Sequence, residues 1–242
     1  MSLKFTSYAS GSGGNFYIID DGGDKLAIEC GIRFKDIQIA TGFKVTELQG
    51  CLISHAHGDH AKSVKEMMEN CVNCYASLDT WEKLPNTHYS KPLLGLYQYQ
   101  IGSFIVKPFH VPHDEGEAGT LGFMVMGKSG ETLLYITDMA YMPHPFEGVT
   151  IIATEANFCE DILHRNVDKG YLHIEVFKRV IKSHCSIQRV VKMLTSNDLK
   201  TVKQIYLMHL SNGNSNAAEF KEKVQRATGI HTTICLEKGM IN

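Results

Sequence analysis

The sequence of 242 residues has no long apolar run and no marked excess of one charge. Its apolar runs fall short of the roughly 18 residues that a bilayer-spanning helix needs, and residues 1–12 lack the apolar stretch of a secretory signal. The formal net charge is −2, which disfavours a protein that coats nucleic acid through an overall positive charge. We therefore expect a cytoplasmic chain that has no membrane partner.

The chain also lacks a dense set of cysteines. Its seven Cys are an odd number spread over a long sequence, whereas disulfide scaffolds have closely spaced Cys in short secreted chains. Cys71 and Cys74 form one C-x-x-C motif, but no second pair follows that could complete the four ligands of a structural zinc site. We interpret the motif as a chance occurrence and expect reduced thiols.

Internal repeats and linkers rich in Pro, Gly or Ser are absent too, which favours a single domain over residues 1–242. Short apolar runs predict strands at residues 4–8, 15–20, 26–29, 50–54, 97–100, 104–108, 121–126, 132–137, 150–153, 205–210 and 232–236. Helical periodicity predicts helices at residues 33–40, 59–69, 171–194 and 215–227. Two strand-rich halves, each ending in helices, indicate an α/β fold with two sheets packed face to face and helices outside.

The most informative segment is His55-Ala56-His57-Gly58-Asp59-His60, which directly follows a predicted apolar strand. Two histidines spaced by two on an extended chain point the same way, so both imidazoles can bind one metal. Asp59 then begins a helix and places its carboxylate beside His60 for a second metal, and Gly58 is expected to permit the sharp turn between the two pairs. Surface histidines on a loop are the alternative, but this pattern arises by chance in only about one such sequence in a thousand.

Two metals need more ligands than one short segment supplies. His113 and Asp138 each follow a predicted strand, and His209 lies near the end of the strand predicted over residues 205–210, where a strand delivers its last residues to one edge of a sheet. Each alone is more often an ordinary polar strand end, but together they favour a site. His110 is an alternative to His113.

The order H-x-H-x-D-H, then His, Asp and His, resembles the metallo-β-lactamase fold superfamily over nearly the whole chain. The resemblance implies a four-layer αββα sandwich with two divalent metal ions at one end of its sheets. It assigns His55, His57 and His113 to the first metal, Asp59, His60 and His209 to the second, and Asp138 as the bridge between them. Zinc is favoured by this set of nitrogen and oxygen ligands, with manganese and iron as alternatives.

Flanking motifs resemble one branch of this superfamily, the WalJ/YycJ group: Ser10-Gly11-Ser12-Gly13-Gly14-Asn15, Leu52-Ile53-Ser54, Thr137-Asp138, Glu155-Ala156-Asn157, and His209-Leu210-Ser211 followed by Asn214. That group is associated with 5′ to 3′ exonuclease action on DNA. Its relatives carry Gly-His-Leu-Ser where this chain has Ser183-His184-Cys185-Ser186, so the resemblance assigns His184 a catalytic role at the phosphate or the leaving group. The pair His113-Asp114 matches the group better than His110 does. The β-CASP insertion of larger nucleases has no room in this length.

Polar residues near the ligands have two interpretations. The glycine-rich segment 11–15 presents backbone N–H groups and Ser12 to a phosphate, or it is only a tight turn. Ser211 and Asn212, directly after His209, contact substrate or satisfy the loop backbone. We predict substrate contacts for Ser12, Asn15, Ser211 and Asn212. Asp59 is first a metal ligand, and we also assign it to orienting the attacking water.

Charge is distributed unevenly along the chain. Residues 1–161 contain 11 Lys and Arg against 20 Asp and Glu, whereas residues 162–203 contain 9 against 3. A basic stretch near a dinuclear site suits a polyanion, although it is also typical of a solvated helix face. The prediction is a phosphodiesterase or nuclease whose substrate is nucleic acid, favouring DNA. A small-molecule hydrolase of a thioester, lactam or lactone, or a non-catalytic binding module, are the alternatives.

Overall fold

The computed structural model describes residues 2–113, 119–142 and 144–235, which form two compact units. The first unit contains residues 2–110 and 119–133, and the second contains residues 111–113, 134–142 and 144–235. A single domain over the whole chain stays a prediction. No helix in these described ranges is both long and apolar enough to cross a membrane.

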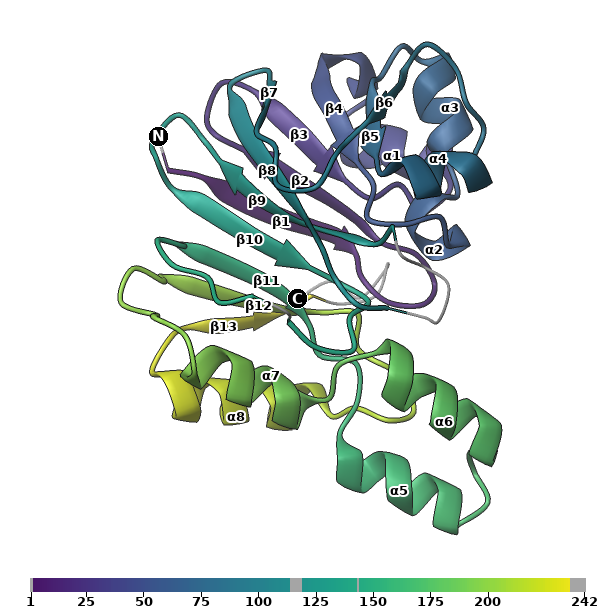
Figure 1. The fold of residues 1–242 in the computed structure, drawn as a ribbon, viewed down its shortest axis with the longest axis vertical. Coiled ribbons are helices and arrows are strands. Elements are labelled where there is room, and N and C mark those ends of the chain that lie inside the picture. The colour runs from purple at the N-terminus through teal and green to yellow at the C-terminus, as the bar shows by residue number, and fades with distance from the viewer. Residues whose placement is uncertain (1, 114–118, 143, 236–242) are drawn as a thin grey trace. The chain divides into compact units, whose positions relative to one another are not determined.

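The first unit contains a sheet of six strands in chain order (Figure 1). Its strands are β1 (Lys4–Ala9), β2 (Phe16–Asp20), β3 (Lys25–Ile28), β4 (Leu48–Leu52), β5 (Cys74–Ala76) and β6 (Ser90–Pro92). The first three pair antiparallel, and β3 to β6 pair parallel. Between the strands lie α1 (Phe34–Ala40), the 3₁₀ helix η1 (Val45–Glu47), α2 (Gly58–Ala61), α3 (Val64–Glu69) and α4 (Leu78–Lys83).

A second sheet has seven strands. In the first unit its order is β9-β8-β7, from β7 (Tyr99–Ile101), β8 (Phe104–His110) and β9 (Leu121–Met126), which pair antiparallel. In the second unit its order is β13-β12-β11-β10, from β10 (Thr132–Ile136), β11 (Ile151–Glu155), β12 (Gln204–Met208) and β13 (Thr232–Ile234). The boundary between the units falls within β10. The strands β11, β12 and β13 are parallel.

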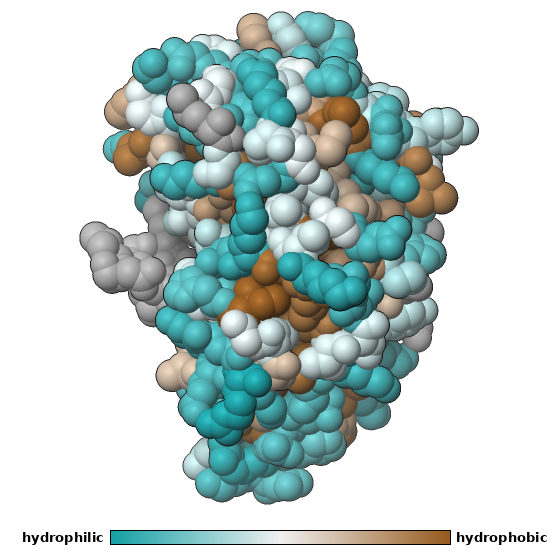
Figure 2. Space-filling view, turned by 90° about the vertical axis from the view of Figure 1, so that its left-hand side faces the viewer, coloured by the Kyte–Doolittle hydropathy of each residue, from teal (hydrophilic) through white to brown (hydrophobic). Residues whose placement is uncertain are grey.

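Helices cover strands within each unit. In the first, Ile37 of α1, Met67 of α3 and Trp81 of α4 join one buried cluster with residues of β2 to β5. The second unit has α5 (Glu160–Asp168), α6 (Ile174–Ser183), α7 (Ile187–Thr195) and α8 (Ala217–Thr228). Figure 1 shows α7 and α8 together beside β11 to β13. On the face drawn in Figure 2, apolar side chains reach the surface in patches within a largely polar surface.

The structure corrects three local predictions. The helix predicted over residues 171–194 is two helices, because Ser186 adopts an extended conformation and its hydroxyl caps α7 by accepting a hydrogen bond from the Arg189 amide. The helix predicted over residues 59–69 is also two, α2 and α3. Gly58 does not have a positive φ, and an added Cβ would meet nothing within 4 Å, so the turn does not require glycine there.

Several short elements are not predicted by the sequence pattern, among them β5, α4, β6 and α5. The last predicted strand extends to Leu236, which lies outside the described residues.

Candidate functional site

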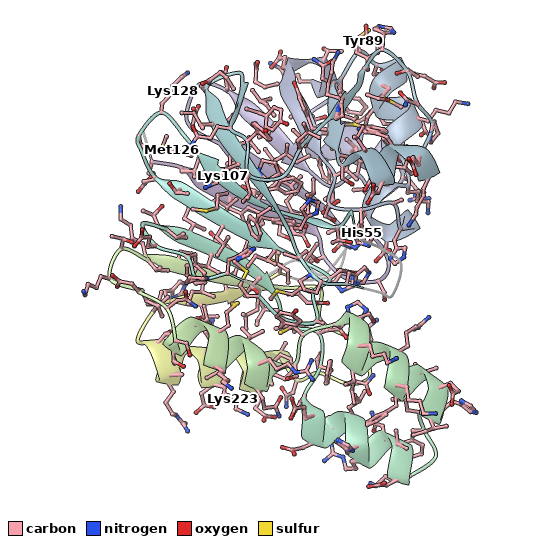
Figure 3. All side chains as sticks on the ribbon, in the orientation of Figure 1. His55, Tyr89, Lys107, Met126, Lys128 and Lys223 are labelled. Atoms are coloured by element: carbon pink, nitrogen blue, oxygen red, sulfur yellow. The ribbon has the colours of Figure 1, made fainter. Side chains whose placement is uncertain are left out.

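The H-x-H-x-D-H segment of the first unit places His55 and His57 in the turn after β4, and Asp59 and His60 in the first turn of α2. Figure 3 shows His55 beside α2. His55 Nε2 lies 2.9 Å from His57 Nδ1, and the ring centroids of His55 and His60 are 4.3 Å apart. His60 Nε2 lies 3.4 Å from an Asp59 carboxylate oxygen. His55 and His60 are buried, whereas His57 and Asp59 are half-buried. The imidazoles and the carboxylate of this short segment therefore lie close together.

A buried glutamate, Glu29, lies behind this segment. Its Oε1 is 3.4 Å from His60 Nδ1, and its Oε2 accepts a hydrogen bond from the Ser54 amide. The Ser54 hydroxyl in turn lies 2.9 Å from His55 Nδ1. Carboxylates and hydroxyls placed behind ligating histidines fix the orientation and the tautomer of the ring. Glu29 and Ser54 therefore orient His60 and His55.

The glycine-rich turn packs directly against the ligand segment. Asn15 is fully buried, its side chain donates to the Asp59 carbonyl at 3.0 Å, and its oxygen accepts the Gly11 amide at 2.9 Å. The side-chain nitrogen of Asn15 also lies 3.3 Å from His60 Nε2. Next to it, a Cβ on Gly31 would lie 1.7 Å from the Asp59 carbonyl oxygen, so only glycine allows this close approach. Asn15 and Gly31 together hold the backbone that carries Asp59 and His60.

Asp138 lies between two histidines of the second unit. Its Oδ2 is 3.9 Å from His113 Nε2, and its Oδ1 is 3.6 Å from His209 Nε2. The His113 ring is oriented from behind, where Nδ1 lies 2.9 Å from the Ser183 carbonyl oxygen. The two oxygens of one carboxylate thus face two different imidazoles, which is the arrangement that a bridging ligand requires.

A second buried glutamate, Glu155, lies at the end of β11. Its Oε1 is 2.5 Å from His184 Nδ1 and 3.4 Å from His209 Nδ1. Its Oε2 accepts the amides of Met139 and Cys185. Asp138, Glu155, His184 and His209 offer ligand atoms that all lie within 4.8 Å of one another.

The Glu155–His184 pair is electrostatically coupled. Burial raises the pKa of Glu155, but the His184 ring beside it outweighs burial and lowers that pKa. Burial likewise lowers the pKa of His184, and the Glu155 carboxylate outweighs that effect and raises it. The pair therefore favours a carboxylate next to a protonated imidazole, with Nδ1 held by Glu155.

Three of these residues have left-handed backbone conformations. The φ angles are 60° at Glu29, 46° at Asp138 and 52° at His209. Non-glycine residues in this region are uncommon, cost roughly 1–3 kcal/mol each, and cluster at functional sites. Each follows a strand closely, so the turn holds its side chain at the strand end while the chain changes direction.

The predicted substrate contacts occupy different environments. Ser12 and Asn212 are exposed, and Ser211 is half-buried. The Ser211 hydroxyl accepts a hydrogen bond from Asn214, and its amide donates to the Asn157 carbonyl. Substrate binding by Ser12, Asn15, Ser211 and Asn212 stays a prediction.

The alternative ligand, His110, is exposed at the end of β8 and packs against Gly95. His113, in contrast, lies beside Asp138. Asp114, the second residue of the predicted His-Asp pair, lies outside the described residues.

Glu29 and Glu155 are functional candidates to which the sequence pattern assigned no role. Both are fully buried acids that end a largely apolar stretch, Leu26-Ala27-Ile28 before Glu29 and Ile151-Ile152-Ala153-Thr154 before Glu155. A charge at the end of a buried strand is uncommon unless it is paired. That position was the signal available in the sequence.

The donor set of each unit is chemically suited to a divalent transition metal. It consists of imidazole nitrogens and carboxylate oxygens, which bind zinc, manganese and iron, and the described ligand clusters contain no thiolate. Oriented histidines with carboxylates behind them are the arrangement found around such ions.

Comparisons with known proteins agree with this chemistry. The sequence model of a family described as "Beta-lactamase superfamily domain" matches residues 38–210. Exodeoxyribonuclease WalJ of Streptococcus pneumoniae is 25% identical over 233 residues, covering 89% of this chain and 84% of that protein. Exodeoxyribonuclease YycJ of Bacillus anthracis is 24% identical over 231 residues, covering 89% of this chain and 85% of that protein. These relatives confirm the resemblance to the WalJ/YycJ group.

The fold is also that of a solved structure. The crystal structure of the metallo-β-lactamase fold protein YhfI from Bacillus subtilis matches 99% of both chains with a TM-score of 0.72, at 14% sequence identity. This likeness confirms the predicted fold class, a layered αββα sandwich built on two sheets.

Proposed function

The chain belongs to the β-lactamase superfamily and is a hydrolase of the metallo-β-lactamase fold, and from this premise we propose that it is a metal-dependent 5′ to 3′ exonuclease that hydrolyses the phosphodiesters of DNA. The observation that carries the proposal is the pair of oriented ligand clusters, in which Glu29 and Glu155 lie behind the histidines. The names of the two exodeoxyribonuclease relatives support the choice of DNA.

The proposed site holds two divalent ions. His55, His57 and His113 would bind the first, and Asp59, His60 and His209 the second, with Asp138 as the bridge. Zinc is favoured, with manganese or iron as alternatives. Two such ions supply an acidified water and positive charge beside a scissile phosphate. The geometry that supports the bridge is the division of the Asp138 oxygens between His113 and His209.

The chain's own residues would donate the proton, orient the water and bind the DNA strand. Glu155 holds Nδ1 of His184 and favours its protonated form, so His184 can donate a proton from Nε2 to the leaving oxygen. Asp59 orients the attacking water in addition to its role as a ligand. Ser12 and Asn212, which are exposed, can donate hydrogen bonds to the strand, and Asn15 and Ser211 complete the predicted contacts.

Digestion of end-labelled DNA tests the proposal. Single- and double-stranded substrates are incubated with the protein and Mn²⁺ or Zn²⁺. A 5′ to 3′ exonuclease releases a 5′ label at once as a mononucleotide and shortens a 3′-labelled strand step by step. Internal fragments from a circular substrate would contradict the exonuclease assignment.

A panel of small substrates separates the alternative activity. A phosphodiester, a thioester and a β-lactam are compared under the same metal conditions. Turnover of the thioester or the lactam without turnover of DNA would overturn the nuclease assignment in favour of a small-molecule hydrolase.

A further inference from the structure

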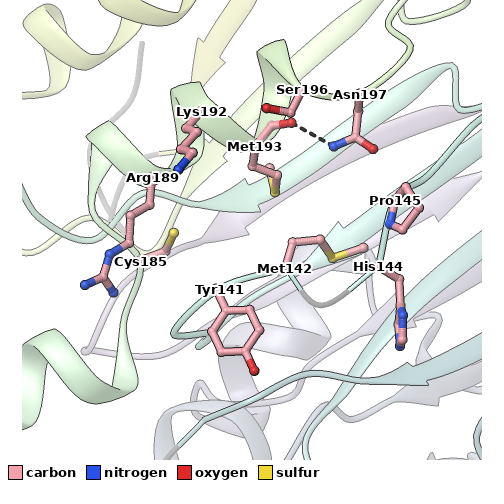
Figure 4. Close-up of a pocket in the computed structure, with 10 residues that line it drawn as sticks. All are labelled: Tyr141, Met142, His144, Pro145, Cys185, Arg189, Lys192, Met193, Ser196 and Asn197. Atoms are coloured by element: carbon pink, nitrogen blue, oxygen red, sulfur yellow. Dashed lines mark hydrogen bonds between the residues drawn. The ribbon is translucent and has the colours of Figure 1, made fainter.

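The second unit contains a pocket that has no part in the ligand clusters. Its volume is about 500 Å³, which falls within the range of roughly 300–1,000 Å³ typical of small-molecule pockets. One wall consists of α7 and the residues that follow it, with Arg189, Lys192, Met193 and Asn197. The opposite wall consists of Tyr141, Met142, His144 and Pro145 (Figure 4).

The charge of this pocket is positive. Arg189 and Lys192 lie three residues apart on α7, so they share a face of the helix. None of the described residues that line the pocket is acidic. Arg189 is held in place because its Nη1 donates to the carbonyls of Ala140 and Ile181, and within the described ranges neither cation forms a salt bridge with a carboxylate. The pocket therefore offers two cations to an anionic ligand.

The rest of the lining is mixed: Tyr141, Met142, Pro145 and Met193 are aromatic or apolar, whereas His144, Ser196 and Asn197 are polar and uncharged or weakly basic. Tyr141 is 57% exposed, and Met142 and Met193 approach from opposite walls in Figure 4. Aromatic rings and thioethers adapt to the flat face of a nucleobase without reading its sequence. A ligand with an aromatic base and a phosphate matches both parts of this lining.

The pocket also adjoins the proposed proton donor along the chain. Cys185 contributes its side chain to the lining, and its amide donates to Glu155, the carboxylate that holds His184. The residue that borders the pocket therefore directly follows His184 and shares its partner.

We propose that this pocket binds one nucleotide of a single DNA strand, with its base against Tyr141, Met142 and Met193 and its phosphate at Arg189 and Lys192. The identity of the ligand rests on the proposed nuclease function. The existence of a site for an anionic, aromatic ligand rests on the lining alone.

Binding measurements on the full chain test this site without requiring catalysis. Fluorescence anisotropy measures the affinity for a short 5′-phosphorylated oligodeoxythymidylate labelled at its 3′ end. Met193→Trp fills the pocket, and Lys192→Ala removes an exposed cation with little risk to folding. Each is expected to raise the Kd about tenfold, the scale of one lost base or phosphate contact. Lys200→Ala removes another exposed lysine, which pairs with Asp198, and serves as the matched control.

Unchanged affinity for the oligonucleotide in both pocket variants would overturn the site. An equal loss of affinity in Lys200→Ala would also overturn it, because it would indicate general charge attraction. Photocrosslinking gives an independent readout: an oligonucleotide that contains 5-iododeoxyuridine should crosslink to the peptide that carries Tyr141. Crosslinks confined to other peptides would overturn the placement of the base.

The same samples distinguish failure of the pocket from failure of the proposed function. The rate of DNA cleavage is divided by the rate of cleavage of bis(p-nitrophenyl) phosphate, a diester too small to occupy the proposed metal site and the pocket at the same time. The ratio should fall in the pocket variants. If the unsubstituted protein binds the oligonucleotide through the pocket but cleaves neither substrate, the nuclease assignment fails while the binding site stands.

Discussion

Asp138 combines two properties that seldom occur together in one side chain. It is nearly fully buried, and its backbone adopts a left-handed conformation. The Thr137 hydroxyl donates to Oδ1, and the two carboxylate oxygens face His113 and His209. The cost of burying a charge in a strained position requires a compensating interaction. A pair of cations shared by this carboxylate would supply it.

Asp138→Ala should therefore abolish turnover and weaken the binding of both metals. A bridging carboxylate serves two ions, so its loss leaves each of them one ligand short. Elemental analysis after mild metal loading is expected to give two metals per chain in the unsubstituted protein and fewer in the variant. Asp198→Ala, an exposed surface change, is the control. Retained activity in Asp138→Ala would show that this residue is not the bridge.

His184→Ala is expected to separate catalysis from metal binding. The proposed role is proton transfer, so the metal content should stay the same while the rate falls by about 10²-fold or more. His231→Ala removes an exposed histidine of the same unit and should change neither quantity. An unchanged rate in His184→Ala would leave His184 as a packing residue, and loss of metal would make it a ligand.

Gly31 sets the position of the ligand segment through a backbone approach. In Gly31→Ala the new Cβ would overlap the carbonyl of Asp59, a backbone atom that cannot move without shifting His60. We expect a loss of about 2–3 kcal/mol or more in the free energy of unfolding, as for other overpacked sites. Gly13→Ala is the matched control, because nothing lies within 4 Å of the added Cβ. Urea unfolding of both variants measures the difference, and equal stability would contradict the close approach.

At the scale of elements, α6 carries a cluster of basic residues. Lys178, Arg179 and Lys182 are exposed on this helix, and Lys178 forms an i,i+3 pair with Glu175. Exposed pairs of this kind contribute little to stability, so a polyanion could replace Glu175 as the partner of Lys178 at small cost.

Replacing Lys178, Arg179 and Lys182 together by Glu should weaken the binding of a DNA strand and flatten its dependence on salt. Each lost phosphate contact reduces the slope of log K against log salt by about 0.7–0.9. The same change at Lys221, Lys223 and Arg226 of α8 controls for net charge. A small diester should be cleaved at nearly the same rate in both. No loss of DNA binding would identify the basic residues as a solvated helix face.

Element boundaries show where prediction from sequence fails. The strands before the ligands were predictable, because apolar runs such as residues 50–54 end in polar residues with metal-ligand spacing. The break at residues 184–186 was not, because helical periodicity continues through it and only the Ser186 cap interrupts the helix. That break places His184 at Glu155. The orienting glutamates likewise depend on contacts between strands that are distant in sequence.

At the scale of the whole molecule, the ligand order along the chain predicted the family and the fold class, and the comparisons confirmed both. What it could not predict is tertiary detail such as the pocket beside α7, since Tyr141 and Lys192 are separated by 50 residues of chain. Stability is also a property of the whole fold, and one buried carboxylate makes part of it depend on pH.

Asp21 joins three turns of the first unit. Its carboxylate accepts hydrogen bonds from the Gly23 and Asp24 amides in its own turn, from the Ser103 hydroxyl and from the Lys128 amide. Burial by itself raises the pKa of Asp21, but these hydrogen bonds outweigh it and lower the pKa to about 2. The ionised form therefore stabilises the fold above the ordinary pKa near 4, and this contribution is lost as the pH falls from about 4 towards 2.

Asp21→Asn should reduce the free energy of unfolding by about 2 kcal/mol at pH 7, the value of a pKa shift of this size. The difference from the unsubstituted protein should shrink to less than about half of that at pH 2, where the native carboxyl is about half protonated and the unfolded one is nearly fully protonated. Urea titrations at both pH values, read as the midpoint and slope of the transition, measure it. Asp198→Asn, at an exposed position, should differ little at either pH. A stability difference for Asp21→Asn that stays constant between pH 7 and pH 2 would mean that the hydrogen bonds, and not the ionised charge that they favour, account for the loss.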